Sequence, residues 1–287
     1  MNHESLESFL HLDRIDIGGL TIENPKPEKE LPFDAERDIS EEDWKKMQEI
    51  FQEYYDIASW DFLLDQSVNI QLLFPSRQAE FKMDDSVWKG AQQMIRSSRE
   101  NSDWYNFTLQ ASSIKLIFRE RYAELKLDES AWQGMKQELE KYRNKPSDWY
   151  CFGFQSLSMK TLFPSCQTEL GLDESVWQGM MQELEDLRKN SSWGSFSAQA
   201  KNMKLLFPDR QVKLGLNNSD WQGMRQRLEG FLKDSEWYDF SVQALNMQIL
   251  SAEEAYINDQ GERVINMRKP KVDLHQEKTP MPVIRNF

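Results

Sequence analysis

Histidine, cysteine and glycine-rich loops are scarce in this chain of 287 residues, and each scarcity excludes a class of chemistry. The three histidines, His3, His11 and His275, lie in the terminal segments, so the central part of the chain offers neither a histidine base nor a multi-histidine metal site. The two cysteines, Cys151 and Cys166, form neither a disulfide framework nor a Cys-x-x-Cys pair. No Gly-x-Gly-x-x-Gly or Walker-type loop occurs. We therefore expect no metal, no cofactor and a reducing, cytoplasmic location.

Long apolar runs are also missing. No stretch approaches the roughly 18 consecutive apolar residues of a membrane helix, and no basic-then-apolar leader opens the chain. We therefore expect neither a membrane span nor Sec-type export. Acidic residues outnumber basic ones by 48 to 35, for a formal charge of −13. Because such a surface repels phosphate backbones, we expect no nucleic-acid partner, and a basic partner is favoured.

Tryptophan, by contrast, is abundant and regularly spaced. The ten tryptophans fall into two registers, each with a spacing of 44 or 45 residues. The first register consists of Trp44, Trp88, Trp132, Trp177 and Trp221. The second register consists of Trp60, Trp104, Trp149, Trp193 and Trp237. A period in the forties is typical of an array of helical repeats, and we expect regular aromatic residues of this kind to form the core and not binding anchors.

Glycine follows the same period inside a predicted helix. It stands two residues after the first-register tryptophan in four of the five units, at Gly90, Gly134, Gly179 and Gly223. Glycine in a helix interior costs about 1 kcal/mol relative to alanine. We therefore expect a neighbouring helix to approach closely at this register.

The sequence pattern of each unit predicts three helices. The first begins after an N-cap residue four positions before its tryptophan, at Ser40, Asp84, Asp128, Asp173 and Asn217. Its apolar residues form one stripe, which indicates an outer layer. The second helix starts near the second-register tryptophan and is apolar over much of its circumference, which indicates a central layer. A short third helix follows a Phe-Pro pair, as at Pro208, and ends at a glycine such as Gly215.

This pattern resembles the armadillo and HEAT class of α-solenoids over residues 39–257. Armadillo repeats that bind extended peptides carry asparagine four residues after a tryptophan. Here the residue four positions after the second-register tryptophan is Leu64, Thr108, Gly153, Ser197 or Ser241. The peptide-binding residues of that class therefore do not carry over. We predict an all-α, right-handed α-solenoid of five three-helix repeats of about 44 residues, about 50 Å long.

The two ends of the chain lack the repeat. We assign residues 1–38 to an N-terminal segment and linker, with a short extended stretch, and residues 258–287 to a C-terminal hairpin and tail. A turn at Asn258–Gly261 predicts a small β-hairpin that caps the open end of the solenoid. The tail is either mobile or a docking peptide that uses Arg285 and Phe287.

A glutamine stands six residues after every second-register tryptophan, with a polar residue three positions further on. These residues are Gln66, Gln110, Gln155, Gln199 and Gln243, followed by Asn69, Ser113, Ser158, Asn202 and Asn246. Two interpretations are open. The amides either form a buried ladder between repeats or line the concave face and hold the main chain of a partner.

Solenoids commonly hold other proteins, so we expect a non-enzymatic scaffold or adaptor for a protein or peptide. The candidate partner-binding residues are Gln66, Gln110, Gln155, Gln199, Gln243, Asn69, Asn202, Asn246, Arg285 and Phe287. One alternative is a structural subunit of a larger assembly, anchored by its tails. A second is a carboxylate-based enzyme, which needs two acidic groups in one cleft. A third is an acidic mimic of nucleic acid.

Overall fold

The computed structural model describes residues 14–17, 20–23, 33, 35–81, 83–145 and 147–266. The chain divides into two units, Met1–Phe33 and Asp34–Phe287. In the first unit, strands β1 (Arg14–Ile17) and β2 (Leu20–Glu23) pair antiparallel, where the sequence predicted only a short extended stretch. The predicted tail, with Arg285 and Phe287, and most of the predicted linker lie outside the described residues.

The second unit is built from helical hairpins, preceded by the short helix α2 (Ala35–Asp38). The first helices of the hairpins are α3 (Glu41–Asp56), α5 (Asp85–Glu100), α7 (Glu129–Arg143), α9 (Glu174–Lys189) and α11 (Asn218–Lys233). The second helices are α4 (Trp60–Leu73), α6 (Trp104–Ile117), α8 (Trp149–Leu162), α10 (Trp193–Leu206) and α12 (Trp237–Ser251). All five predicted N-caps are confirmed, because each side chain accepts a backbone N–H of its helix.

The short third elements are 3₁₀ helices and not turns of α-helix. They are η1 (Pro75–Glu80), η2 (Tyr122–Leu125), η3 (Pro164–Leu170) and η4 (Pro208–Leu214). Gly171 and Gly215 end η3 and η4 with positive φ angles of 59° and 60°, as predicted. The tighter 3₁₀ winding is common in such short connectors.

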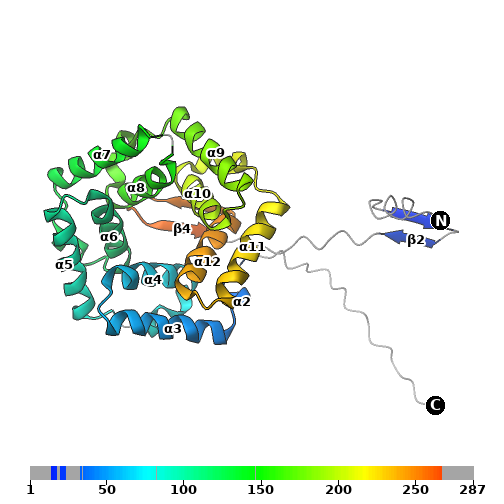
Figure 1. The fold of residues 1–287 in the computed structure, drawn as a ribbon, viewed down its shortest axis with the longest axis horizontal. Coiled ribbons are helices and arrows are strands. Elements are labelled where there is room, and N and C mark those ends of the chain that lie inside the picture. Colours follow the sequence, from blue (N-terminus) through cyan, green and yellow to red (C-terminus); the bar gives the residue numbers. More distant parts are fainter. Residues whose placement is uncertain are drawn as a thin grey trace, which may run out of the picture. The chain divides into compact units, whose positions relative to one another are not determined.

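The hairpins close into a ring. The second helices form the inner wall, where each packs against the next, and α12 returns to pack against α4 and α3 (Figure 1). The first helices form the outer wall. The open array about 50 Å long that the sequence predicted is therefore corrected to a closed one, since the turn between successive hairpins accumulates until the last meets the first.

Both tryptophan registers pack within the wall. Four first-register tryptophans are buried, and each meets the phenylalanine that ends its own inner helix, with ring centroids 4.6 to 5.3 Å apart. The second-register tryptophans reach the next outer helix. A Cβ atom on Gly179 would lie 2.2 Å from the ring of Trp149, and Gly90, Gly134 and Gly223 are covered in the same way. The predicted close approach at the glycine register is thus confirmed.

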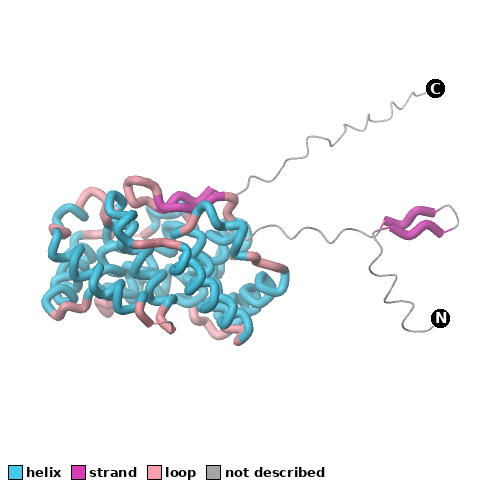
Figure 2. The backbone as a smooth tube through the Cα atoms, turned by 90° about the horizontal axis from the view of Figure 1, so that it is seen from above, coloured by secondary structure: helices cyan, strands magenta, loops and turns pink. Residues whose placement is uncertain are grey.

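The predicted C-terminal hairpin is confirmed as β3 (Glu254–Ile257) paired with β4 (Arg263–Asn266). It lies across one face of the helical ring and packs on α10 and η4 (Figure 2). Its turn residue Gly261 has a φ of 77°, and a Cβ atom there would lie 2.0 Å from the carbonyl oxygen of Thr161. The hairpin therefore covers the C-terminal ends of the inner helices, and it does not cap an open end as predicted. None of the described helices is long and apolar enough to cross a membrane.

Candidate binding well inside the helical ring

Each inner helix turns one stripe of residues toward the interior of the ring. The phenylalanines three positions after the second-register tryptophan, such as Phe107 and Phe196, are fully buried toward the outer layer. The positions one, five and eight residues after that tryptophan lie on another face, at spacings of four and three. We call these positions the lumen stripe. It comprises Asp61, Asp65, Val68, Tyr105, Leu109, Ser112, Tyr150, Phe154, Leu157, Gly194, Ala198, Lys201, Tyr238, Val242 and Leu245.

Three charged residues meet in this interior. Lys201 of α10 interacts electrostatically with Asp65 of α4, although these helices are not neighbours in the ring. Arg263 of β4 interacts with both. Lys201 is only 6% exposed, whereas Asp65 and Arg263 are half-buried. We use the name well for the interior of the ring between the lumen stripe and the β3–β4 hairpin, where Lys201 and Arg263 lie toward the end that the hairpin covers.

Neither cation is fully paired. Asp65 Oδ1 accepts a hydrogen bond from Ser113 Oγ at 2.9 Å, and its Oδ2 accepts one from the Tyr238 hydroxyl at 3.5 Å. Lys201 Nζ lies 4.7 Å from the centre of the Phe154 ring. Within the described part of the chain, Arg263 Nε has no hydrogen-bond acceptor, and no ion pair within 4 Å joins Lys201 or Arg263 to a carboxylate. The buried Lys201 and the half-buried Arg263 therefore share one carboxylate.

Burial shapes the ionisation of this cluster. The pKa of Lys201 is lowered to about 7, mainly by burial and also by the nearby Arg263 guanidinium, while Asp65 partly opposes the shift. Burial also lowers the pKa of Arg263 to about 10 and raises the pKa of Asp65, whose hydrogen bonds from Ser113 and Tyr238 act the other way. Because the charged form of Lys201 is the disfavoured one, an anion in the well would stabilise it.

Other interior lysines, in contrast, donate hydrogen bonds to backbone carbonyls of the fold. Each caps the C-terminal end of the next inner helix, where unpaired carbonyls carry partial negative charge. Lys115 Nζ donates to the carbonyl oxygen of Thr161 at 2.7 Å, and Lys204 Nζ donates to that of Ala252 at 2.6 Å. Lys160 donates in the same way to Leu205. Lys201 is distinguished from these residues because it has no carbonyl to cap.

The glutamine register lies between helices and not in the well. Gln66, Gln155 and Gln199 are fully buried, Gln243 is 1% exposed, and Gln110 is half-buried. The oxygen of Gln66 accepts a hydrogen bond from Ser241, that of Gln243 from Ser197 and that of Gln110 from Ser98. The amide nitrogen of Gln155 donates to Thr108, and that of Gln199 donates to Glu183.

The asparagines of the next register lie in the same interfaces. The amide nitrogen of Asn69 donates to Ser241, and that of Asn246 donates to Ser197. Asn202 is fully buried, and its side-chain oxygen and nitrogen have no partner among the described residues. The candidate partner-binding amides of the described region therefore lie in the wall of the ring, where most of them are buried, although Gln110 is half-buried and Asn246 also borders a pocket between α10, α11 and α12.

Sequence reasoning missed the three residues of the well. The signal that marks two of them is a charge at an otherwise uncharged register. Asp65 stands where the other units have leucine, phenylalanine, alanine and valine, and Lys201 stands where they have valine, serine and two leucines. Arg263 belongs to no repeat, so the repeat pattern carries no signal for it.

Comparison of the chain with protein-family models, with curated proteins and with solved structures gave no match. The assignment of the site therefore rests on its geometry and chemistry. Within the described part of the chain, no three histidine, cysteine, aspartate or glutamate side chains are placed together to hold a metal ion.

Proposed function

We propose that this protein binds a small organic anion in the well and holds its anionic group with Lys201 and Arg263. The observation that carries the proposal is that the buried Lys201 and the half-buried Arg263 share a single carboxylate. A buried charge without a partner is costly, and an anionic oxygen would supply charge-assisted hydrogen bonds to both cations. The two cations and Asp65 leave one net positive charge, which matches a monoanion such as a carboxylate.

The mouth of the well constrains the rest of the ligand. Asp61 and Asp239 lie near the N-terminal ends of α4 and α12, and both are exposed. These carboxylates disfavour a second acidic group at the far end of the ligand. The favoured class is therefore a small carboxylic acid with an uncharged or cationic remainder, bound without chemical change.

The protein-binding scaffold remains a second candidate, on a different surface. We propose that the ring is a right-handed array of five repeats, so that a partner protein meets its outer surface and rim instead of a long concave groove. The supporting observation is an exposed apolar pair at the turn between α3 and α4, where Ile57 is 72% exposed and Phe62 is 44% exposed. Such a pair suits a protein contact, and a cytoplasmic adaptor without catalytic activity would use it.

Removal of the Lys201 charge tests the anion-binding proposal. We expect Lys201→Met to weaken the binding of propanoate and 3-phenylpropanoate at least tenfold (about 1.4 kcal/mol), as measured by NMR titration at pH 6.5. Lys189→Met removes the same charge from a side chain that is 68% exposed on α9, and it should leave both affinities within twofold. Equal affinities in wild type and Lys201→Met would contradict the proposal.

A further inference from the structure

On the N-terminal side of Lys201, the lumen stripe of α10 carries smaller side chains than the lumen stripes of the other inner helices. Tyrosine occupies the first stripe position on three other inner helices, at Tyr105, Tyr150 and Tyr238, and α4 carries Asp61 there. On α10 this position is Gly194, followed by Ala198 one turn later. A Cβ atom built on Gly194 would meet nothing within 4 Å. The wall is therefore hollow where the repeat pattern otherwise places an aromatic ring.

This space belongs to a pocket of about 460 Å³ between α10, α11 and α12 that is open to solvent. Tyr150, Trp193, Phe231 and Val242 supply its apolar lining, and Arg227, Asp239 and Asn246 are among its polar groups. The volume lies within the range of pockets that bind small molecules, about 300 to 1,000 Å³. The aromatic walls favour a flat, apolar occupant, because aromatic groups gain from stacked or edge-on contact with one another.

The cavity and Lys201 lie along one face of the same helix. Gly194, Ala198 and Lys201 are spaced by four and three residues, so they succeed one another on α10. A helical side chain leans toward the N-terminus of its helix. Lys201 Nζ accordingly lies 4.7 Å from the ring of Phe154, which occupies on α8 the stripe position that Ala198 occupies on α10. The ammonium is thus about one helical turn, roughly 5 Å, from the level of Gly194.

We infer that the hollow at Gly194 is a subsite for an aromatic ring, and that the ligand class is an aryl-substituted short-chain carboxylic acid. This inference rests on the proposed function, because it places the carboxylate of the same ligand at Lys201. A linker of two or three bonds between the aromatic ring and the carboxylate spans one helical turn. Asp239 beside the hollow disfavours a second carboxylate on the aromatic ring, although Arg227 lines the same hollow.

Restoring the tyrosine of the other repeats tests the subsite. Gly194→Tyr fills the hollow with the side chain that three other inner helices carry at this position, so we expect the helical circular dichroism and cooperative unfolding to be kept. The test ligands are 3-phenylpropanoate, propanoate and 3-phenylpropan-1-ol, which carry both groups, the acid alone and the aromatic ring alone. Their affinities are measured by NMR titration of wild type, Gly194→Tyr and Lys201→Met. Gly194→Ala, which leaves most of the space open, serves as the matched control.

We expect Gly194→Tyr to weaken 3-phenylpropanoate and 3-phenylpropan-1-ol at least tenfold and to leave propanoate within twofold. Gly194→Ala should change all three affinities less than threefold. Unchanged affinity for 3-phenylpropanoate in Gly194→Tyr would overturn the subsite, while binding of propanoate would still support the proposed function. If the wild-type protein binds the alcohol and neither acid, and Gly194→Tyr loses the alcohol, the subsite is supported and the proposed function fails. Absence of binding by all three ligands would overturn both.

Discussion

A hydroxyl group four residues after the second-register tryptophan links neighbouring inner helices. Ser197 donates to the oxygen of Gln243 at 2.7 Å and accepts from Asn246 at 3.1 Å. Ser241 makes the same two bonds with Gln66 and Asn69, whereas Thr108 accepts a hydrogen bond from the amide nitrogen of Gln155. On α8 this position is Gly153, and the amide of Asn202 that faces it is buried without a partner among the described residues. A buried amide without a hydrogen-bond partner lowers the free energy of unfolding.

We predict that Gly153→Ser raises the free energy of unfolding by about 1 kcal/mol. The serine improves helix propensity and supplies the missing hydroxyl for Asn202. The new Cβ atom would lie 3.0 Å from Met180 Cε and 3.3 Å from Asn202 Nδ2, and both of these atoms end flexible side chains. Urea unfolding at pH 7 measures the change. Gly153→Ala is the control, since it adds the Cβ atom alone, and a serine variant no more stable than the alanine variant would contradict the prediction.

At the scale of single residues, the sequence predicts positions that repeat better than positions that depart from the repeat. The N-caps and the glycine register were predictable because a cap or a close approach has the same physical cause in every unit. Asp65 and Lys201 break their registers, and a break alone does not reveal that helices α4 and α10 face each other across a well. That relation depends on the closure of the ring, and Arg263 joins it only through the fold of the hairpin.

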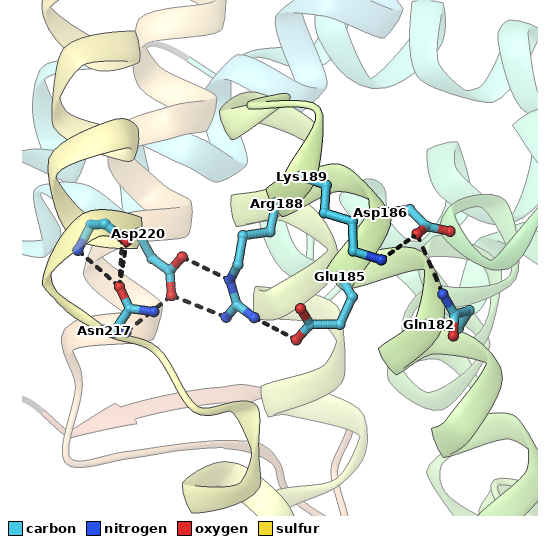
Figure 3. A network of polar contacts seen from close by, with 8 residues as sticks. Gln182, Glu185, Asp186, Arg188, Lys189, Asn217 and Asp220 are labelled. Atoms are coloured by element: carbon cyan, nitrogen blue, oxygen red, sulfur yellow. Dashed lines mark hydrogen bonds and ion pairs between the residues drawn. The ribbon is translucent and has the colours of Figure 1, made fainter.

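At the scale of elements, the end of one outer helix contacts the beginning of the next. Arg188 near the end of α9 donates from Nε and Nη2 to the two carboxylate oxygens of Asp220, at 2.8 and 3.0 Å (Figure 3). Asp220 is fully buried and also accepts from the backbone N–H of Asn217, the N-cap of α11. Arg99 and Asp128 make the corresponding contact between α5 and α7 at 2.8 Å, but Asp128 is 55% exposed.

We predict that Arg188→Met lowers the free energy of unfolding by about 3 to 5 kcal/mol, because it leaves the Asp220 carboxylate buried without its cation. The double variant with Asp220→Asn should lose less than the sum of the two single variants. Arg99→Met provides the matched control, and its exposed partner limits the expected loss to less than about 1 kcal/mol. Equal losses for the Arg188 and Arg99 variants, measured by urea unfolding, would show that burial of the carboxylate is not the deciding factor.

The type and order of the long helices were predictable from capping and apolar periodicity, and the C-terminal hairpin was predictable from its turn. The short elements after Phe-Pro were predicted as short helices without a specified winding, and they are 3₁₀ helices. The propensities of so few residues do not separate the two windings, and packing against the helical ring selects the tighter one.

At the scale of the whole molecule, closure of the ring is the feature that the sequence did not predict. The repeat period fixes the contents of each hairpin, but the angle between hairpins follows from packing across their interfaces. The interface between α4 and α12, where the ring closes, has contacts of its own, and we call it the seam. Phe62 and Tyr238 meet edge to face at 5.2 Å, and Ser241 Oγ donates to Gln66 at 2.6 Å. The first repeat carries Lys46 where the other repeats carry glycine, so the seam departs from the glycine register.

Closure gives Lys201 its surroundings. The titratable groups that act on it are Arg263 from β4 and Asp65 from α4, and Asp65 in turn accepts a hydrogen bond from Tyr238 of α12. The folded-state pKa of about 7 lies below the ordinary value of 10.5, so the unfolded chain binds the extra proton between these two values. Lys201 therefore destabilises the folded state most below pH 7, and this destabilisation decreases as the pH rises from 7 to 10.5.

An NMR titration of the Lys201 side chain tests the central claim most directly. The protein is labelled with ¹³C and ¹⁵N lysine, the signal is assigned by its loss in Lys201→Met, and the pH is varied with and without 3-phenylpropanoate. A closed ring with an anion-binding well predicts that Lys201 titrates near pH 7 in the free protein, and that the bound carboxylate raises this pKa by stabilising the ammonium. A lysine that titrates near its ordinary value of 10.5 and does not respond to the carboxylate would contradict both the enclosure of Lys201 and its role in binding.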